Sequence, residues 1–205
     1  ADAPFKQGVD SVAPTDIEYA RELGYRIKHL GIARREGDAL QLRVHPTLIP
    51  ESKAIAQVDG VLNAVMISAS GVGELLLVGP GAGSRPTASA VMADVVSITR
   101  SVTGNEQPDV RSMGVRVDAL SQPAIVPISE VSSGWYLRLG AEDKPGVMAA
   151  FTHCLSQHAI GIESLIQKPE STELAKVPVI LLTDEAPTRA IELATADIEA
   201  LPSVG

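Results

Sequence analysis

Aromatic residues, cysteine and long apolar runs are all scarce in this chain of 205 residues. Aromatics make up only 3%, so a core must rest on aliphatic side chains, and the hydrophobic fraction of 45% is ordinary for a globular protein. The single cysteine, Cys154, cannot form an internal disulfide, which fits a reducing, cytoplasmic setting. No apolar run reaches the length of a membrane span, and residues 1–10 lack the basic start and apolar stretch of a signal peptide. We therefore expect neither a membrane partner nor secretion.

A surplus of basic residues is also missing. The formal net charge is −8, whereas contacts to phosphate backbones need clustered Lys and Arg, so we expect no nucleic-acid partner. The length allows one large domain or two small ones.

A glycine-rich stretch is the most informative feature that is present. The apolar run Leu75–Val78 predicts a buried strand, and Gly79, Gly81 and Gly83 follow it at alternate positions. A helix then opens near Pro86, because proline suits a first helical turn. Residues with helical spacing form its apolar face: Ala88, Val91, Met92, Val95, Ile98 and Val102. A strand, a glycine turn and a helix N-terminus together can hold a phosphate or amide close to the backbone.

This stretch is not a complete dinucleotide fingerprint. The third glycine of G-x-G-x-x-G would stand where the chain has Ser84, and no acidic residue follows at the distance of a ribose-binding residue. From the residues alone, a cofactor contact and a tight structural turn both remain open.

The segment before the glycines predicts a helix and an antiparallel sheet. We expect Thr15 to cap a helix, with Glu18 completing a capping box. Alternating residues then predict four strands in one antiparallel sheet: Tyr25–Ala33, Ala39–Val44, Val61–Ser68 and Glu74–Val78. His45 lies beside Pro46, and a lone histidine there is typical of a turn or core residue rather than a catalytic one.

The pattern changes after Gly104. Residues 105–131 carry four Pro or Gly positions with little period and predict a linker, which separates a domain at 1–104 from one at 132–205. The second domain predicts strand, helix, strand, strand and helix in that order, which is the split βαβ arrangement without its closing strand. The fold class is therefore α+β, an antiparallel sheet with helices followed by a ferredoxin-like βαββα(β) unit.

Two resemblances extend this interpretation. GPGAGSRPTASAVMAD resembles the glycine turn and helix of the homoserine dehydrogenase family, as do DIEYARELGYRIKHLGIA, RVHPTLIP and VDGVLNAV in the family's order. YLRLGAEDKPGVMAAFTHCLSQHAIGIESLIQ resembles an ACT domain, the amino-acid-sensing module that follows the catalytic part of many members. The resemblance implies the C-terminal portion of such an enzyme, with both ends of the chain cut.

The family implies hydride transfer between NAD or NADP and the pair L-homoserine and L-aspartate 4-semialdehyde. Its Rossmann fingerprint and catalytic lysine and aspartate have no counterpart here, so we assign no catalytic residue and expect the chain alone to be inactive. Lys6 and Asp2 lack the surrounding motif. The cofactor contacts carried over are Gly81, which approaches the dinucleotide, and Gly79 and Gly83, which shape the turn. The preference for NAD or NADP stays open.

The resemblance also implies a homodimer through the strands of 25–78 and an amino-acid site in the second domain. We expect threonine to bind where the turn enters the helix, at Asp143, Pro145, Gly146 and Val147, because unpaired N–H groups there attract a carboxylate. The alternative is that Pro145-Gly146 only makes a tight turn.

Other candidates are weaker. His153 and His158 are five residues apart and do not share a helix face, so we expect no metal site. Cys154 lies among apolar positions, which favours a core role. The rival hypotheses for the chain are a free-standing amino-acid-binding regulatory protein and a dimerisation scaffold without ligand.

Overall fold

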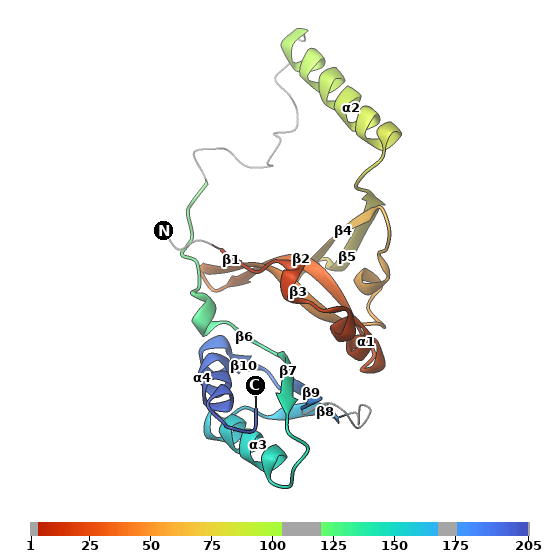
Figure 1. Cartoon of the computed structure of the whole chain (residues 1–205). Helices are drawn as coiled ribbons and strands as arrows, with labels where there is room; N and C mark the ends of the chain where they lie inside the picture. Colours follow the sequence, from red (N-terminus) through yellow and green to blue (C-terminus); the bar gives the residue numbers. More distant parts are fainter. Residues whose placement is uncertain (1–3, 104–119, 168–175, 205) are drawn as a thin grey trace. The chain divides into compact units, whose positions relative to one another are not determined.

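A computed structural model describes residues 4–103, 120–167 and 176–204. The chain divides into two compact units, which are considered separately (Figure 1). Unit 1 combines residues 1–48 with 123–205, and unit 2 spans residues 49–122. The predicted boundaries at 104 and 131 stay a prediction, and most of the predicted linker, residues 105–119, lies outside the described residues.

The N-terminal part of unit 1 is a sheet with one helix. Its elements are β1 (Phe5–Lys6), the 3-10 helix η1 (Val9–Ser11), α1 (Pro14–Glu22), β2 (Tyr25–Glu36) and β3 (Ala39–Pro50). The strand order is β1-β3-β2, and β1 runs parallel to β3. Both long strands continue past the predicted ends. Pro46 is tolerated inside β3 because β1 pairs only with Arg43 and Val44, so no partner on that side needs the missing N–H.

The predicted cap of α1 is wrong. The N-cap is Ala13 instead of Thr15, and Pro14 takes the first helical position. The Asp16 carboxylate accepts a hydrogen bond from the Ala13 N–H at 2.8 Å, so it fills the role that we predicted for Glu18. An acid at the third helical position is all that this half of a capping box needs.

The C-terminal part of unit 1 has the predicted order of elements. They are η4 (Ile128–Glu130), β6 (Ser132–Ser133), β7 (Tyr136–Ala141), α3 (Val147–Gln157), β8 (Ile162–Gln167), β9 (Val177–Thr183), β10 (Ala186–Pro187) and α4 (Thr188–Glu199). The main sheet is antiparallel with the order β7-β9-β8. Val204 makes an antiparallel bridge to Ala141 at the other edge of β7.

The core of unit 1 lies between this sheet and its two helices. Phe151 and Leu155 of α3 and Ile198 of α4 are fully buried against Val179 and Leu181 of β9. Cys154 belongs to the same cluster and is 7% exposed, which confirms its core role. Burial of aliphatic side chains therefore replaces the aromatic content that the chain lacks.

The two segments of unit 1 are joined by hydrogen bonds. Leu40 N donates to Ala124 O and Val126 N donates to Leu40 O, both at 2.9 Å. Tyr136 and Arg138 alternate with the core-facing Leu137 and Leu139 on β7, so they project from the sheet face opposite the helices. That face meets α1, as the site geometry below shows.

Unit 2 is built differently. It holds η2 (Ala54–Gln57), β4 (Leu62–Ala69), β5 (Gly73–Pro80) and α2 (Ser84–Thr103). Among the described strands, β4 and β5 pair antiparallel with each other in a sheet distinct from β1-β3-β2, so the single four-stranded sheet that we expected is two sheets. Among the residues of unit 2 that the structure describes, Ile49 and Ala56 are the buried apolar ones, and α2 buries none. Unit 2 therefore presents most of its apolar side chains on its surface.

Candidate functional site

The glycine turn joins β5 to α2, as predicted. Gly81 donates its N–H to Val61 O at 2.9 Å, and a Cβ added to Gly81 would overlap the Asn63 side chain. Gly83 has φ +119°, a conformation that glycine adopts without strain. Space around Gly79 is open. The backbone conformation therefore favours glycine at position 83, a larger residue at position 81 would displace the Asn63 side chain, and the cofactor contact stays a prediction.

The second predicted site is the turn before α3. Gly146 is the N-cap of α3 with φ +91°, and a Cβ added there would meet no atom within 4 Å. Backbone conformation, rather than lack of room, thus calls for glycine. Asp143 Oδ1 lies 3.4 Å from its donor Gln167 Nε2. Asp143, Pro145 and Gly146 are exposed, whereas Val147 is buried in the core.

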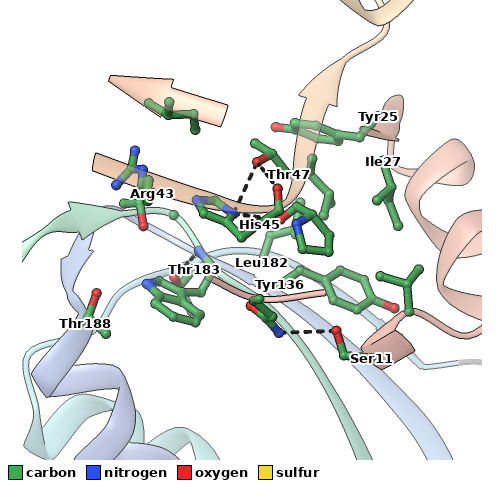
Figure 2. A pocket seen from close by; sticks show the side chains of 18 of the residues that line it. Ser11, Tyr25, Ile27, Arg43, His45, Thr47, Tyr136, Leu182, Thr183 and Thr188 are labelled. Atoms are coloured by element: carbon green, nitrogen blue, oxygen red, sulfur yellow. Dashed lines mark hydrogen bonds between the residues drawn. The ribbon is translucent and has the colours of Figure 1, made fainter. Parts of the chain in front are cut away.

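A cavity that no sequence pattern predicted lies inside unit 1 (Figure 2). Its volume is about 330 Å³. Its walls come from residues near the N-terminus, from β2 and β3, and from the segment around β6, β7 and β9. The apolar part of the wall includes Phe5, Ile27, Ile32, Leu48, Ile128 and Leu182. The walls come from two segments that are far apart in the sequence, residues 5–48 and 128–188, which is why local spacing could not reveal the cavity.

Asp16 anchors the cavity floor. It is 4% exposed, and its Oδ1 accepts hydrogen bonds from the Tyr136 hydroxyl and the Arg138 Nε, each at 2.7 Å. Its Oδ2 accepts the Ala13 N–H described above. Burial and then the Asp16 carboxylate raise the pKa of Tyr136 above its usual value of 10.0. A buried carboxylate with three donors is a satisfied one, and it ties α1 to β7.

His45 lies in the cavity wall, half-buried. Its Nδ1 is 2.8 Å from Pro46 O and 3.2 Å from the Thr47 hydroxyl (Figure 2). Burial lowers the pKa of His45, which outweighs the opposing hydrogen bond to Pro46 O. The ring is therefore neutral at pH 7.

Three buried polar atoms have no hydrogen-bond partner among the described residues. They are Gln41 Oε1, Arg43 Nε and Trp135 Nε1. Arg43 and Trp135 both line the cavity. Burial lowers the pKa of Arg43, and Arg34 adds to this effect. Unpaired buried donors are rare in folded proteins, so two of them around one cavity call for an explanation.

The remaining candidates do not form a site. His158 pairs with Asp197 at 2.7 Å on the surface. Within the described ranges, His, Cys, Asp and Glu side chains form no group of three or more that could hold a metal ion. In the same ranges, no helix is both long enough and apolar enough to cross a membrane.

The fold defines an α+β protein with antiparallel sheets, and comparison with known proteins gives the family. The family model described as homoserine dehydrogenase matches residues 3–96. Homoserine dehydrogenase of Pseudomonas aeruginosa is 44% identical over 203 residues, and that of Neisseria gonorrhoeae is 43% identical over 202 residues. These alignments cover 99% and 98% of this chain, and 47% and 46% of the relatives.

Solved structures agree. A homoserine dehydrogenase from Thiobacillus denitrificans has a TM-score of 0.85 and 44% identity, covering 97% of this chain and 44% of that one. An S. aureus homoserine dehydrogenase has a TM-score of 0.58 at 24% identity, which supports the fold alone; the match covers 93% of this chain and 43% of that one. The chain belongs to the homoserine dehydrogenase family, and it spans about half the length of the curated relatives it matches.

Proposed function

We propose that this chain is part of an NAD(P)-dependent homoserine dehydrogenase, which interconverts L-homoserine and L-aspartate 4-semialdehyde in threonine and methionine biosynthesis in the cytoplasm. The observation that carries the proposal is the 44% identity to the Pseudomonas aeruginosa enzyme across nearly the whole chain. The activity belongs to the longer protein, because this chain matches under half of that relative's length.

The glycine turn fits a role beside the cofactor. NAD(P) would supply the hydride acceptor or donor. The Asn63 amide lies where a Cβ of residue 81 would be, so glycine at this position keeps the turn compact beside the proposed cofactor site. Gly83 lets the chain turn sharply into α2. Gly79 has no side chain, and the space where its Cβ would be is free within 4 Å. The NAD or NADP choice lies with residues that this turn does not include.

The 205-residue chain alone is then inactive, since no residue of it has been assigned to hydride or proton transfer. Purified chain is assayed for homoserine-dependent reduction of NAD and NADP beside the longer enzyme. Activity of the isolated chain would refute its proposed inactivity. If the longer enzyme acted only on another substrate, the proposed homoserine dehydrogenase activity would be refuted.

Residues 132–205 are proposed to form an ACT domain that binds threonine at Asp143, Pro145, Gly146 and Val147. The β7-α3-β8-β9-α4 order and the exposed turn at the start of α3 support this. Threonine binding changes activity only if it favours one conformation of the enzyme over another.

The test is calorimetry of threonine binding to the longer enzyme. Gly146→Leu combines bulk with strain at φ +91°, so a better variant is Gly146→Ala, with Gly24→Ala as the control. Gly24 has φ +79° and equally open surroundings, so both variants carry similar backbone strain. Loss of threonine binding in Gly146→Ala alone supports the site, and equal binding in both variants refutes it.

Self-association is the last part of the proposal, and we infer a homodimer that uses unit 2. Val65 of β4 and Leu77 of β5 are directly opposite each other and are 58% and 62% exposed. The neighbouring pair, Ile67 and Leu75, lies on the same face and is 44% and 43% exposed, and a continuous apolar patch of this kind is typical of an interaction surface. Light scattering is expected to give the dimer mass, and Leu77→Arg to shift it to the monomer mass. A monomer mass for the unmodified chain at micromolar concentration would refute this inference.

A further inference from the structure

We propose that the cavity of unit 1 binds a small α-amino acid, with its carboxylate at Arg43 and Trp135 and its ammonium group toward Glu163 and His45. This site is separate from residues 143–147 and from the glycine turn, none of which line the cavity. It goes beyond the proposed function and stands on the geometry of unit 1 alone.

The size of the cavity limits the ligand. A volume of about 330 Å³ lies at the lower end of the range for small-molecule sites. The apolar wall, which includes Ile27, Leu48 and Leu182, accommodates an aliphatic side chain.

The unpaired donors define one end of the ligand. Arg43, His45 and Thr47 occupy alternate positions on β3, so their side chains project from the same face of the strand. Arg43 Nε and Trp135 Nε1 are buried and have no partner in the described part of the chain. Both groups only donate hydrogen bonds, whereas a carboxylate only accepts them. A ligand carboxylate would therefore satisfy both, and the bond to the guanidinium would be charge-assisted.

The other side of the cavity offers acceptors. Figure 2 shows His45 between Arg43 on one side and Tyr25 and Ile27 on the other. The Tyr25 hydroxyl donates to Glu163 Oε1 at 3.2 Å, and a carboxylate has capacity for several further hydrogen bonds. Glu163 also lines the cavity. An ammonium group is the natural partner for this end.

The tautomer of His45 adds a second acceptor. Pro46 O can only accept, so the proton of the neutral ring lies on Nδ1, which faces it at 2.8 Å. Nε2 then carries the lone pair. Asp16 does not compete for the ligand, because it already accepts from Ala13, Tyr136 and Arg138. The cavity wall thus holds unpaired donors as well as acceptors, which matches the two charged groups of a zwitterion.

Trp135 makes the proposal directly measurable, because it is the only tryptophan of the chain. The 205-residue chain is titrated with glycine, L-alanine, L-threonine and L-homoserine while tryptophan fluorescence is recorded. Propionate, which lacks the ammonium group, and ethylamine, which lacks the carboxylate, are the matched probes. We expect a saturable change with at least one amino acid, and binding about tenfold weaker for both probes.

Variants locate the ligand. Arg43→Met keeps the apolar stem and should weaken binding about tenfold or more, whereas Arg35→Met, an exposed arginine on β2, should leave it unchanged. Glu163→Gln changes an exposed residue and so spares the fold; it should weaken amino-acid binding but not propionate binding. Trp135→Phe, followed by calorimetry, should also weaken binding.

Several outcomes would overturn the proposal. No saturable change up to roughly 10 mM amino acid means that the cavity holds water only. Equal affinity for propionate makes it an anion site without amino-acid recognition. Binding that is lost in Gly146→Ala but kept in Arg43→Met and Glu163→Gln places the amino acid at the 143–147 turn, which would support the proposed threonine site and refute this one.

Discussion

Unit 1 and unit 2 differ in where they keep their apolar side chains. Nearly all of the buried apolar residues belong to unit 1, whereas unit 2 contributes Ile49 and Ala56. Unit 2 instead exposes Val65, Leu77 and most of the apolar face of α2. The two have similar sequence patterns, so alternation and helical spacing show that an apolar face exists but not what covers it. In unit 1, α3 and α4 cover the apolar face of the sheet β7-β9-β8. In unit 2 the apolar side chains of β4, β5 and α2 stay exposed.

The largest expected effect comes from the core of unit 1. Leu155→Ala removes a side chain that is fully buried in α3, so the free energy of unfolding should fall by about 3 kcal/mol. Urea unfolding followed by Trp135 fluorescence measures this. The control is Leu193→Ala on α4, where the leucine is 49% exposed and the loss should be small. Equal losses in the two variants would contradict the described core.

The next effect tests whether residues 1–48 belong with 123–205. Asp16→Ala leaves the Tyr136 hydroxyl and Arg138 without their shared acceptor and should lower the free energy of unfolding by about 2 kcal/mol. Arg138 is half-exposed, so water compensates part of the loss. Asp38→Asn breaks an exposed pair with Arg35 and is the control. A loss no larger than that of Asp38→Asn would mean that the Asp16 contacts do not hold residues 1–48 and 123–205 together.

The free energy of unfolding of unit 1 should depend on pH through the protonation of His45. Burial lowers its pKa in the folded protein below the unfolded value of 6.5, so below about pH 6.5 the unfolded chain takes up the proton first. Stability from this group is present above pH 6.5 and is lost as the pH falls toward the folded pKa. Urea unfolding at several pH values should show this decline in the unmodified chain and a shallower one in His45→Gln. Parallel curves would exclude His45 as the cause.

The smallest effect is expected in unit 2. Leu77→Ala truncates a side chain that is 62% exposed on β5 of the single chain, so at protein concentrations too low for the proposed dimer the free energy of unfolding measured at Trp135 should change by less than about 0.5 kcal/mol. The same experiment at high protein concentration sharpens the comparison, because a partner surface that covers Leu77 would make the loss larger. A loss as large as that of Leu155→Ala at every concentration would contradict the division into units.

The sequence predicted what depends on near neighbours. The order of strands and helices, the glycine turn and the core role of Cys154 all follow from spacing within single elements. The predicted cap at Thr15 was wrong because the sequence also allows the helix to begin two residues earlier. In the structure Pro14 takes the first helical position and Asp16 the third. The cavity was missed because Arg43 and Trp135 are brought together by pairing between distant segments. The glycines at 81 and 146 were singled out, yet the reasons found for them are an overlap with Asn63 and a positive φ.

The discontinuity of unit 1 has a consequence for synthesis. The Asp16 contact to Tyr136 spans 120 positions, and the whole of unit 2 is made between the two segments that unit 1 requires. At about 5–20 residues per second, the ribosome holds the first segment for several seconds before its partner emerges. During that time α1, β2 and β3 lack the β7 contacts that satisfy Asp16. Unit 1 therefore completes its folding only after translation has passed α4, because α4 contributes Ile191 and Ile198 to its core.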